Sequence, residues 1–201
     1  MLGESHGIAE TANALLSLVR RLDIRSLALE WSYDEVGDVV QSVFDSGRID
    51  LDALWEVPLG GDLFASDGRF TAGHIAAIEE LVRTGELEQL ILFDRLDGGG
   101  PSQVERDEAM ASHLLAGLQP ECPTLAVAGA YHVVREPNDG SESMATRVKR
   151  VLPNLGNGAL EFSSGSCHFK IDQPVEPLDR PFDAIFRLGP ATPATVPSRR
   201  T

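Results

Sequence analysis

The sequence is poor in cysteine and in long apolar runs, and each shortage excludes a class of protein. Its two cysteines, Cys122 and Cys167, form neither a Cys-x-x-Cys pair nor a zinc-type cluster. This predicts two reduced thiols and leaves a disulfide between them open. No apolar run approaches the roughly 20 residues of a membrane span, and the first residues lack the basic and apolar regions of a signal peptide. We therefore expect a cytoplasmic protein that does not enter a membrane.

Basic residues are also scarce relative to acidic ones. The chain has 17 lysines and arginines against 31 aspartates and glutamates, for a formal net charge of −14. A protein of this sign repels a phosphate backbone and an anionic lipid surface, which argues against nucleic acid or a membrane as a partner. With 42% hydrophobic residues over 201 positions, the chain can pack a core rather than stay disordered. The expected partner is a small-molecule substrate.

The sequence does contain a regular alternation of helical and strand patterns. Apolar residues recur at helical spacing in five segments, at 8–22, 33–46, 71–84, 102–118 and 143–152. Short apolar runs, typical of buried parallel strands, occur at 26–30, 87–94, 124–128, 159–162 and 183–188. The alternation predicts an α/β fold with a mostly parallel central sheet covered by helices on both faces.

Boundary signals suggest how this domain is organised. Residues 1–189 should form one domain, with 50–70 as an irregular insertion, 97–101 as a flexible loop and 190–201 as a disordered tail. Ser32 with Glu35, and Ser102 with Glu105, have the spacing of a capping box at a helix start. Gly47 predicts the end of the helix that Ser32 would open.

Charged side chains follow several of the predicted strands. The run 27–29 is followed by Glu30, the run 90–93 by Asp94, and the strand at 124–128 leads through Gly129 to His132. The opening Gly3-Glu4-Ser5-His6-Gly7 immediately precedes a helix, where a strand-to-helix turn belongs. In an open α/β sheet, ligands bind beyond the carboxyl ends of the strands. We therefore expect five side chains to converge at one edge of the sheet: Glu4, His6, Glu30, Asp94 and His132.

Each of these residues also has an ordinary structural explanation. A carboxylate that ends a strand often caps the next helix, which is the simpler role for Asp94. We assign His74, near a helix start, and His113, on a polar helix face, to structure or solvent, and His168 has no assigned role. A site is favoured by the joint pattern, in which two histidines each stand three residues after a glycine and acidic residues accompany them.

Arg106 is a further candidate because of its place on a helix. Arg106, Met110 and Leu114 share one helix face, and the two apolar residues must face the core. The helix dipole disfavours an arginine in a first turn unless a carboxylate lies beside it. Glu4, Glu30 or Asp107 could be that carboxylate, which would bring Arg106 into the site.

Together these motifs resemble the superfamily that joins erythromycin esterases, ChaN-like haem-binding uptake proteins and Tiki/TraB proteins. Four short motifs carry the resemblance in matching order over about residues 2–135: Gly3-Glu4-Ser5-His6-Gly7, Glu30, Arg106-Asp107 with Met110-Ala111, and Ala128-Gly129-Ala130-Tyr131-His132. The resemblance implies an α/β domain whose pocket is lined by Glu4, His6, Glu30 and His132. The histidine that matches His6 is similar to a general base in the esterase branch. The Tiki branch is linked to divalent-metal-dependent proteolysis, and the ChaN branch binds haem.

The sequence departs from this superfamily in several ways. One residue separates Glu4 from His6, as in the ChaN and Tiki branches, whereas the esterase branch commonly has two. The segment 50–70 is too short to replace the helical subdomain of the esterases, which argues against macrolide cleavage. The lipobox typical of ChaN-like lipoproteins does not occur. Only Met1 and Leu2 precede Gly3, so we expect the first strand to be missing. Either the start codon is assigned too late, which we favour, or the protein works without a normal first strand.

The resemblance and the residues together predict a hydrolase acting on ester or amide bonds. We expect His6 to be the general base, Glu4 or Glu30 to orient it, and His132 to act as an acid or transition-state donor. Arg106 would stabilise developing negative charge.

Three further residues, and an uncertain cofactor, complete the expected site. Substrate would also contact Asp94, Asp107 and Tyr131. His6, Glu30 and His132 could hold a divalent metal ion, and the metal-free and metal-assisted versions of the reaction stay equally open.

Two alternatives remain at this point. The first is a non-catalytic protein that binds haem or another planar ligand, with Tyr131 and His132 as iron ligands. Such haem would be non-covalent because no Cys-x-x-Cys-His motif occurs. With 6% aromatic residues and three methionines, the chain offers little material for apolar pocket walls. The second alternative is an inactive remnant of the superfamily.

Overall fold

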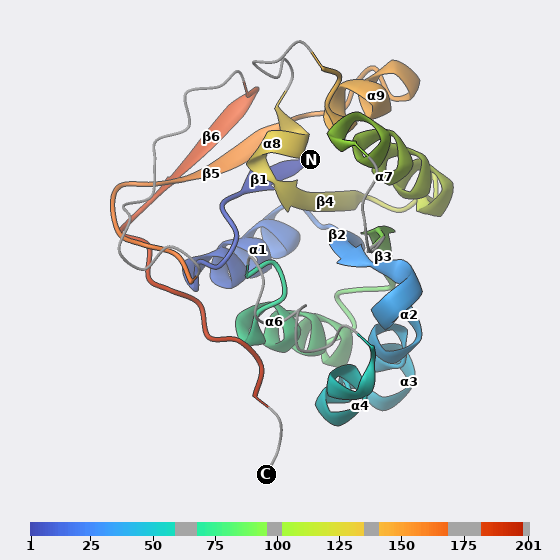
Figure 1. The fold of residues 1–201 in the computed structure, drawn as a ribbon, viewed down its shortest axis with the longest axis vertical. Coiled ribbons are helices and arrows are strands. Elements are labelled where there is room, and N and C mark those ends of the chain that lie inside the picture. The colour runs from blue at the N-terminus through green and yellow to red at the C-terminus, as the bar shows by residue number, and fades with distance from the viewer. Residues whose placement is uncertain (59–67, 96–101, 135–140, 169–181, 199–201) are drawn as a thin grey trace.

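A parallel β-sheet with helices on both faces organises the computed structural model, which describes residues 1–58, 68–95, 102–134, 141–168 and 182–198 (Figure 1). The strands of the sheet are β1 (Leu2–Glu4), β2 (Ser26–Ser32), β3 (Gln89–Asp94), β4 (Thr124–Gly129), β5 (Gly158–Phe162) and β6 (Ala184–Leu188). They lie in the order β3-β2-β4-β1-β5-β6, and every neighbouring pair is parallel. The predicted α/β fold class is confirmed.

The helices fill the connections between these strands. They are α1 (Glu10–Arg21), α2 (Tyr33–Gln41), α3 (Val43–Ser46), α4 (Leu51–Glu56), α6 (Ala72–Arg83), α7 (Gln103–Gly117), α8 (Ala130–Val133) and α9 (Met144–Val151). Four of the five predicted helices have ends within two residues of those observed. The fifth, predicted at 33–46, is divided into α2 and α3, and Gly47 ends it with φ of 72° as expected.

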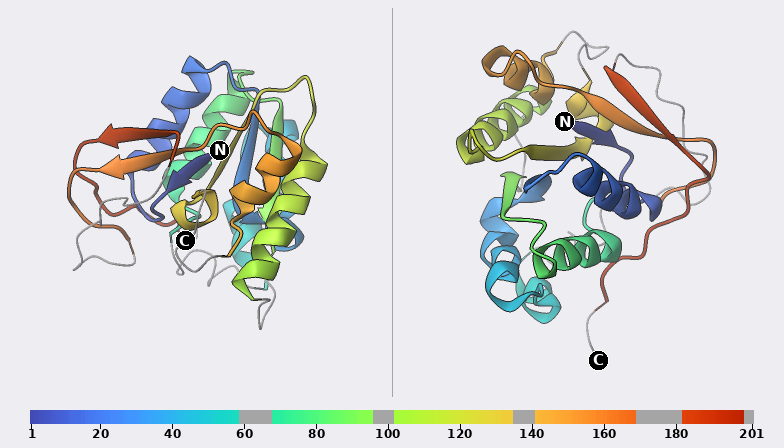
Figure 2. Two further views of the ribbon diagram at one scale, coloured as in Figure 1. Left: turned by 90° about the horizontal axis from the view of Figure 1, so that it is seen from above. Right: turned by 180° about the vertical axis from the view of Figure 1, so that it is seen from behind.

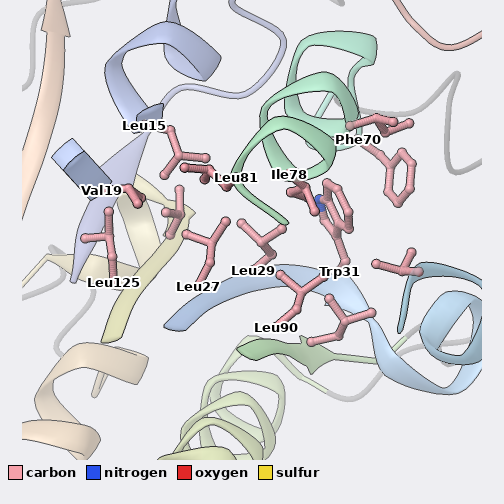
Figure 3. Close-up of a cluster of buried hydrophobic side chains, with 14 of the residues drawn as sticks. Leu15, Val19, Leu27, Leu29, Trp31, Phe70, Ile78, Leu81, Leu90 and Leu125 are labelled. Atoms are coloured by element: carbon pink, nitrogen blue, oxygen red, sulfur yellow. The ribbon is translucent and has the colours of Figure 1, made fainter. Parts of the chain in front are cut away.

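Alternate residues of β2, β3 and β4 face two separate hydrophobic cores. The helices that cover these cores lie on opposite sides of the sheet (Figure 2). On one side, Leu27 and Leu29 of β2 pack beneath α1 and α6, as Figure 3 shows with Ile78 and Leu81 of α6. On the other side the intervening residues, such as Ala28, pack beneath α7 and α9. A strand that is buried on both faces must be apolar at every position, which explains why the strand runs in this sequence are continuous rather than alternating.

Two segments near the chain's start differ from their expected structure. Leu2–Glu4 do form a strand, β1, which lies between β4 and β5, so the expectation of a missing first strand was wrong. Three residues suffice because both neighbours pair with them and Leu2 is fully buried. The segment 50–70 was expected to be irregular, but α4 opens it, with Asp50 accepting hydrogen bonds from the backbone N–H groups of Asp52 and Ala53. Residues 59–67 of this segment, and the loop predicted at 97–101, lie outside the described residues.

The C-terminal segment also differs from the expected disordered tail, at least over residues 190–198. Its backbone follows the loop after β1: the Ala9 N–H donates to the Thr192 carbonyl at 2.9 Å, and the Ala194 N–H donates to the Gly7 carbonyl at 2.8 Å. Ala191 and Ala194 are buried. The prolines of this segment interrupt any helical or strand pattern in the sequence, which is why disorder was expected. Its small side chains nevertheless let the backbone pack closely. Residues 199–201 lie outside the described part of the chain.

One of the two predicted capping boxes is present. Ser102 accepts a hydrogen bond from the Glu105 backbone while Glu105 bonds the Ser102 backbone in return. At Ser32 the box was wrong: β2 continues through Ser32, whose hydroxyl donates to Asp34 Oδ1 at 2.6 Å instead. Ser32 does precede the first residue of α2, but its side chain makes no capping hydrogen bond to the backbone of that helix.

Two simpler expectations concern thiols and membranes. Cys122 and Cys167 are both unpaired, as predicted. Within the described ranges, none of the helices combines the length and the apolar character needed to traverse a bilayer.

Candidate active site

Four neighbouring strands, β3, β2, β4 and β1, bring charged residues to the carboxyl edge of the sheet. Asp94 is the last residue of β3, Glu4 is the last residue of β1, and Glu30 lies near the end of β2. His6 follows β1 in the turn before α1, and His132 lies on α8, directly after β4. The five side chains expected to converge therefore do so, as the distances below show.

His6 lies between two glutamates, one at each nitrogen of its ring. Its Nδ1 is 3.1 Å from Glu4 Oε1, and its Nε2 is 3.5 Å from Glu30 Oε2. Burial alone would lower the pKa of His6, but the hydrogen bonds to Glu30 and Glu4 outweigh it and raise that pKa to about 10. Burial alone would raise the pKa of Glu4, but the hydrogen bond with His6 and the nearby imidazole of His74 hold it at about 2. The pair is therefore an imidazolium with a carboxylate at neutral pH.

Two arginines and two carboxylates form a ring of charges beside His6. Arg106 donates to Glu30 Oε1 at 2.7 Å and to Asp94 Oδ2 at 2.6 Å. Arg69 approaches the same two oxygens, at 2.9 Å and 2.8 Å. Burial alone would raise the pKa of Glu30, but the charge of Arg69, the largest opposing effect, together with the contact to His6 holds it well below its usual range. Glu30 and Asp94 thus each have two guanidinium partners, as buried carboxylates require.

His132 forms a second acid–imidazole pair across the edge from His6. Its Nδ1 is 2.6 Å from Oδ1 of Asp107, a fully buried residue on α7. Asp107 Oδ1 accepts a hydrogen bond from Nδ1, and the tautomer with its proton on Nδ1 has its lone pair at Nε2. That Nε2 is 3.5 Å from Glu30 Oε1. Glu30 therefore lies between the two imidazoles, and its Oε2 also accepts the Gly129 N–H at 2.7 Å.

The remaining predicted residues also lie here. The carboxylate expected beside Arg106 is Glu30, with Asp94 in addition, while Asp107 bonds His132 instead. Tyr131 is half-buried, and its ring meets that of His132 edge-on at 5.9 Å between centroids. Of the other histidines, His113 packs against Tyr33 with 4.4 Å between ring centroids, which agrees with a structural role.

Sequence reasoning missed two residues, Arg69 and His74. Arg69 lies in the segment expected to be irregular, where no periodicity marks a buried side chain, although Trp31 fixes its backbone by donating to the Arg69 carbonyl at 2.9 Å. His74 was assigned to structure or solvent from its position near a helix start. It is buried, and its Nε2 is 3.7 Å from Glu4 Oε2. No local pattern could have identified either contact, because both partners are distant in sequence.

The residues proposed as metal or iron ligands do not fit that role. Among the side chains described, no three His, Cys, Asp or Glu residues are grouped as metal ligands. Glu30 Oε1 already faces two guanidinium groups, which would repel a cation. An iron at His132 Nε2 would also lie beside Glu30 Oε1, where the guanidinium groups of Arg106 and Arg69 would repel it.

Comparisons with protein-family models, with curated proteins and with solved structures found no match.

Gly129 is predicted to be a position where a single methyl group disrupts the site. A Cβ at Gly129 would lie 2.9 Å from His6 Nε2 and 3.5 Å from Glu30 Oε2, closer to His6 than ordinary packing allows. Gly129→Ala should therefore move His6 away from Glu30 while the protein stays folded, which NMR of the His6 ring nitrogens would detect. Gly37→Ala is the matched control, because a Cβ there has nothing within 4 Å. An unchanged His6 signal in Gly129→Ala would contradict the observed packing.

Proposed function

We propose that this site hydrolyses an ester or amide bond of a small-molecule substrate, with His132 as the base that activates water. The observation that carries the proposal is the 2.6 Å contact between His132 Nδ1 and the buried Asp107, beside a cluster of cationic groups. A buried carboxylate that holds one imidazole nitrogen directs the lone pair to the other nitrogen, as in catalytic acid–histidine pairs. The net charge of −14 favours a neutral or cationic substrate over a polyanion.

We assign His6 the role of a fixed positive charge rather than that of the general base. The sequence suggested His6 as the general base, but a group with a pKa of about 10 holds its proton at neutral pH and cannot accept another. The hydrogen bonds to Glu30 and Glu4 that raise its pKa stabilise the His6 imidazolium as a cation. It contributes positive charge close to Glu30 and Arg106.

Arg106 is the second cationic group that supports the proposal. It is about a quarter exposed, at 24% of its side chain, so a ligand can reach it. Its Nε and Nη2 bond Asp94 and Glu30, and its Nη1 has no hydrogen bond to a described residue. A guanidinium anchored in this way can donate its remaining N–H groups to an oxygen that becomes negative in the transition state.

The proposed reaction then follows as two proton transfers at His132. Its Nε2 takes a proton from water as the water oxygen bonds to the carbonyl carbon, and Arg106 with His6 stabilises the resulting oxyanion. When this intermediate collapses, the same Nε2–H returns the proton to the leaving alcohol or amine. Water is consumed, an acid is released, and His132 ends neutral. Asp107 keeps the ring oriented throughout and stabilises its transient charge.

The test compares two histidine variants on activated substrates. His132→Asn is expected to lower kcat/KM for p-nitrophenyl esters or p-nitroanilides by about 10²–10⁴-fold, because it removes the base. His113→Asn is the matched control: His113 is on α7 but packs against Tyr33 rather than in the site, so its rate should equal that of the wild type. Spectrophotometric rates of both variants at pH 7 check this.

Two outcomes would overturn the proposal. The first is a wild-type protein that hydrolyses none of these esters or amides. The second is an equal rate in His132→Asn and His113→Asn, which would mean that surface groups cause the hydrolysis. Haem binding, the other function expected from the resemblance, is checked by titrating haemin into the protein, and a Soret band lost in His132→Asn would support it instead.

A further inference from the structure

His74, the buried histidine that was assigned to structure or solvent, lies beside Glu4 at the carboxyl edge of the sheet. It is the third residue of α6 and is only 2% exposed. Its Nδ1 is 2.9 Å from the hydroxyl of Thr71, and its Nε2 points to Glu4, 3.7 Å from Oε2. The His74 ring also meets the Trp31 ring edge-on. The polar side of this imidazole is therefore directed at Thr71 on one side and Glu4 on the other.

Hydrogen bonding at Thr71 indicates which nitrogen of His74 carries the proton. The Thr71 Oγ1 accepts the backbone N–H of His74 at 3.2 Å, as the cap of α6. Its hydroxyl proton is then available to donate to Nδ1. In that arrangement Nδ1 is the acceptor and the ring proton lies on Nε2, facing Glu4. The opposite tautomer would place a bare Nε2 opposite Glu4 Oε2, which, unlike Glu30 Oε1, has no guanidinium donor among the described residues.

Glu4 needs such a donor. Its Oε1 receives His6, but its Oε2 is fully buried and has no hydrogen bond within the described part of the chain. An unsatisfied buried carboxylate oxygen is costly. The Nε2–H of His74, at 3.7 Å, is slightly beyond hydrogen-bond length, and a small shift of either side chain completes the contact.

The geometry points to His74 as a positioning residue of the site, which donates Nε2–H to Glu4 and thereby fixes the carboxylate that orients His6. The contacts form one continuous path from Thr71 through His74 and Glu4 to His6. Among the described residues, no hydrogen bond or ion pair joins His74 to Arg106 or His132, so its effect on the reaction is indirect. This inference rests on the proposed function for its effect on the reaction rate, but its geometry can be tested without any activity.

The first test measures the tautomer of His74 in the unmodified protein. Long-range ¹H–¹⁵N NMR distinguishes a protonated ring nitrogen from an unprotonated one. The expected result is a proton on Nε2 of His74, with Nδ1 as an acceptor from Thr71. A proton on Nδ1 alone, with Nε2 bare, would overturn the inference whatever the protein catalyses.

The second test compares two amide replacements of His74. The side-chain nitrogen of His74→Gln can reach the position of Nε2 and still donate to Glu4, whereas that of His74→Asn reaches only the position of Nδ1, beside Thr71. His74→Asn should shift the ¹⁵N signals of His6 and lower kcat by about 10- to 100-fold through misplacement of His6, with KM changed less than twofold. His74→Gln should restore most of the wild-type ¹⁵N signals of His6 and most of kcat.

The two variants also separate this inference from the proposed function. If His6 signals and kcat are the same in His74→Asn and His74→Gln, the role of His74 is only structural and the inference is wrong. If the wild type hydrolyses no ester or amide, the proposed function fails, while the His6 signals in the two variants still decide whether His74 positions Glu4 and His6.

Discussion

Replacing Arg106 with methionine is expected to lower the free energy of unfolding by about 3–5 kcal/mol, the usual cost of removing one partner from a buried ion pair. Glu30 and Asp94 are 3% and 2% exposed, and among the described residues Arg69 is then the one guanidinium left beside both of them. Methionine replaces the aliphatic part of the arginine side chain, so the change removes charge more than volume. Urea denaturation of the wild type and Arg106→Met at pH 7 measures the difference.

An exposed arginine provides the matched control for this substitution. Arg25 forms an ion pair with Glu88 at the surface, where the two side chains are 38% and 59% exposed. Arg25→Met should change the unfolding midpoint little, because solvent screens such pairs. Equal losses in Arg25→Met and Arg106→Met would contradict the buried charge ring.

The same variant tests the catalytic role of Arg106. If its free N–H groups stabilise an oxyanion, Arg106→Met should also reduce kcat by about 10²–10³-fold, measured where the variant is still folded. Arg106→Met with Asp94→Leu removes both members of one ion pair and should recover part of the stability but none of the rate. Recovery of the rate as well would show that Arg106 acts only through stability.

Stability is expected to be greatest between about pH 5 and pH 6.5 and to fall on both sides, because His6 and Glu4 titrate in opposite directions. The pKa of Glu4 is about 2 in the folded protein, below its ordinary value of 4.5. Its contribution is therefore complete above pH 4.5 and is lost as the pH falls toward 2. The pKa of His6 is about 10, above its ordinary value of 6.5. Its contribution is complete below pH 6.5 and is lost as the pH rises toward 10.

Each side of this pH profile is expected to lose on the order of 3 kcal/mol. The two losses share one ion pair, so they are not independent contributions to stability. Urea unfolding of the wild type and His6→Asn from pH 3 to pH 10 measures them. The variant has no imidazole at this position, so its stability should change less between pH 6.5 and pH 10.

Comparing how steeply the stabilities of wild type and His6→Asn change with pH separates the titration of His6 from the effect of the net charge of the chain. With a net charge of −14, the protein repels itself more as the pH rises, but this repulsion acts on wild type and variant alike. If the stability curves of wild type and His6→Asn were parallel above pH 6.5, His6 would not be held as a cation. Its proposed role as a fixed positive charge would then be wrong.

The features of this protein that the sequence could predict are those that depend on local patterns. Continuous apolar runs such as Leu90–Phe93 predicted buried parallel strands, and residues such as Leu114 at helical spacing predicted the helices that cover them. Parallel strands end at one edge, so Glu4, Glu30, Asp94 and His132 could be expected together before any contact was known. Short-range signals failed where a neighbouring element took over, as at Ser32, where β2 continues through the expected cap.

Other features depend on contacts between residues far apart in the chain. Arg69 and His74 enter the site from segments whose local pattern shows nothing unusual, and the segment 190–198 is ordered by backbone hydrogen bonds to residues 7–9 and 72. Such contacts leave no periodicity in the sequence. They follow from which loops the packed sheet and helices bring side by side.

The fold class and the edge at which charged groups gather can be read from residue order, because hydrophobic periodicity acts over a few positions. The charge of each group there depended on its neighbours in space. His6 is a base by residue type, yet Glu4 on one side and Glu30 on the other make it a cation. The free energy of a buried proton depends on the charges within a few ångströms of it, and folding alone places those charges.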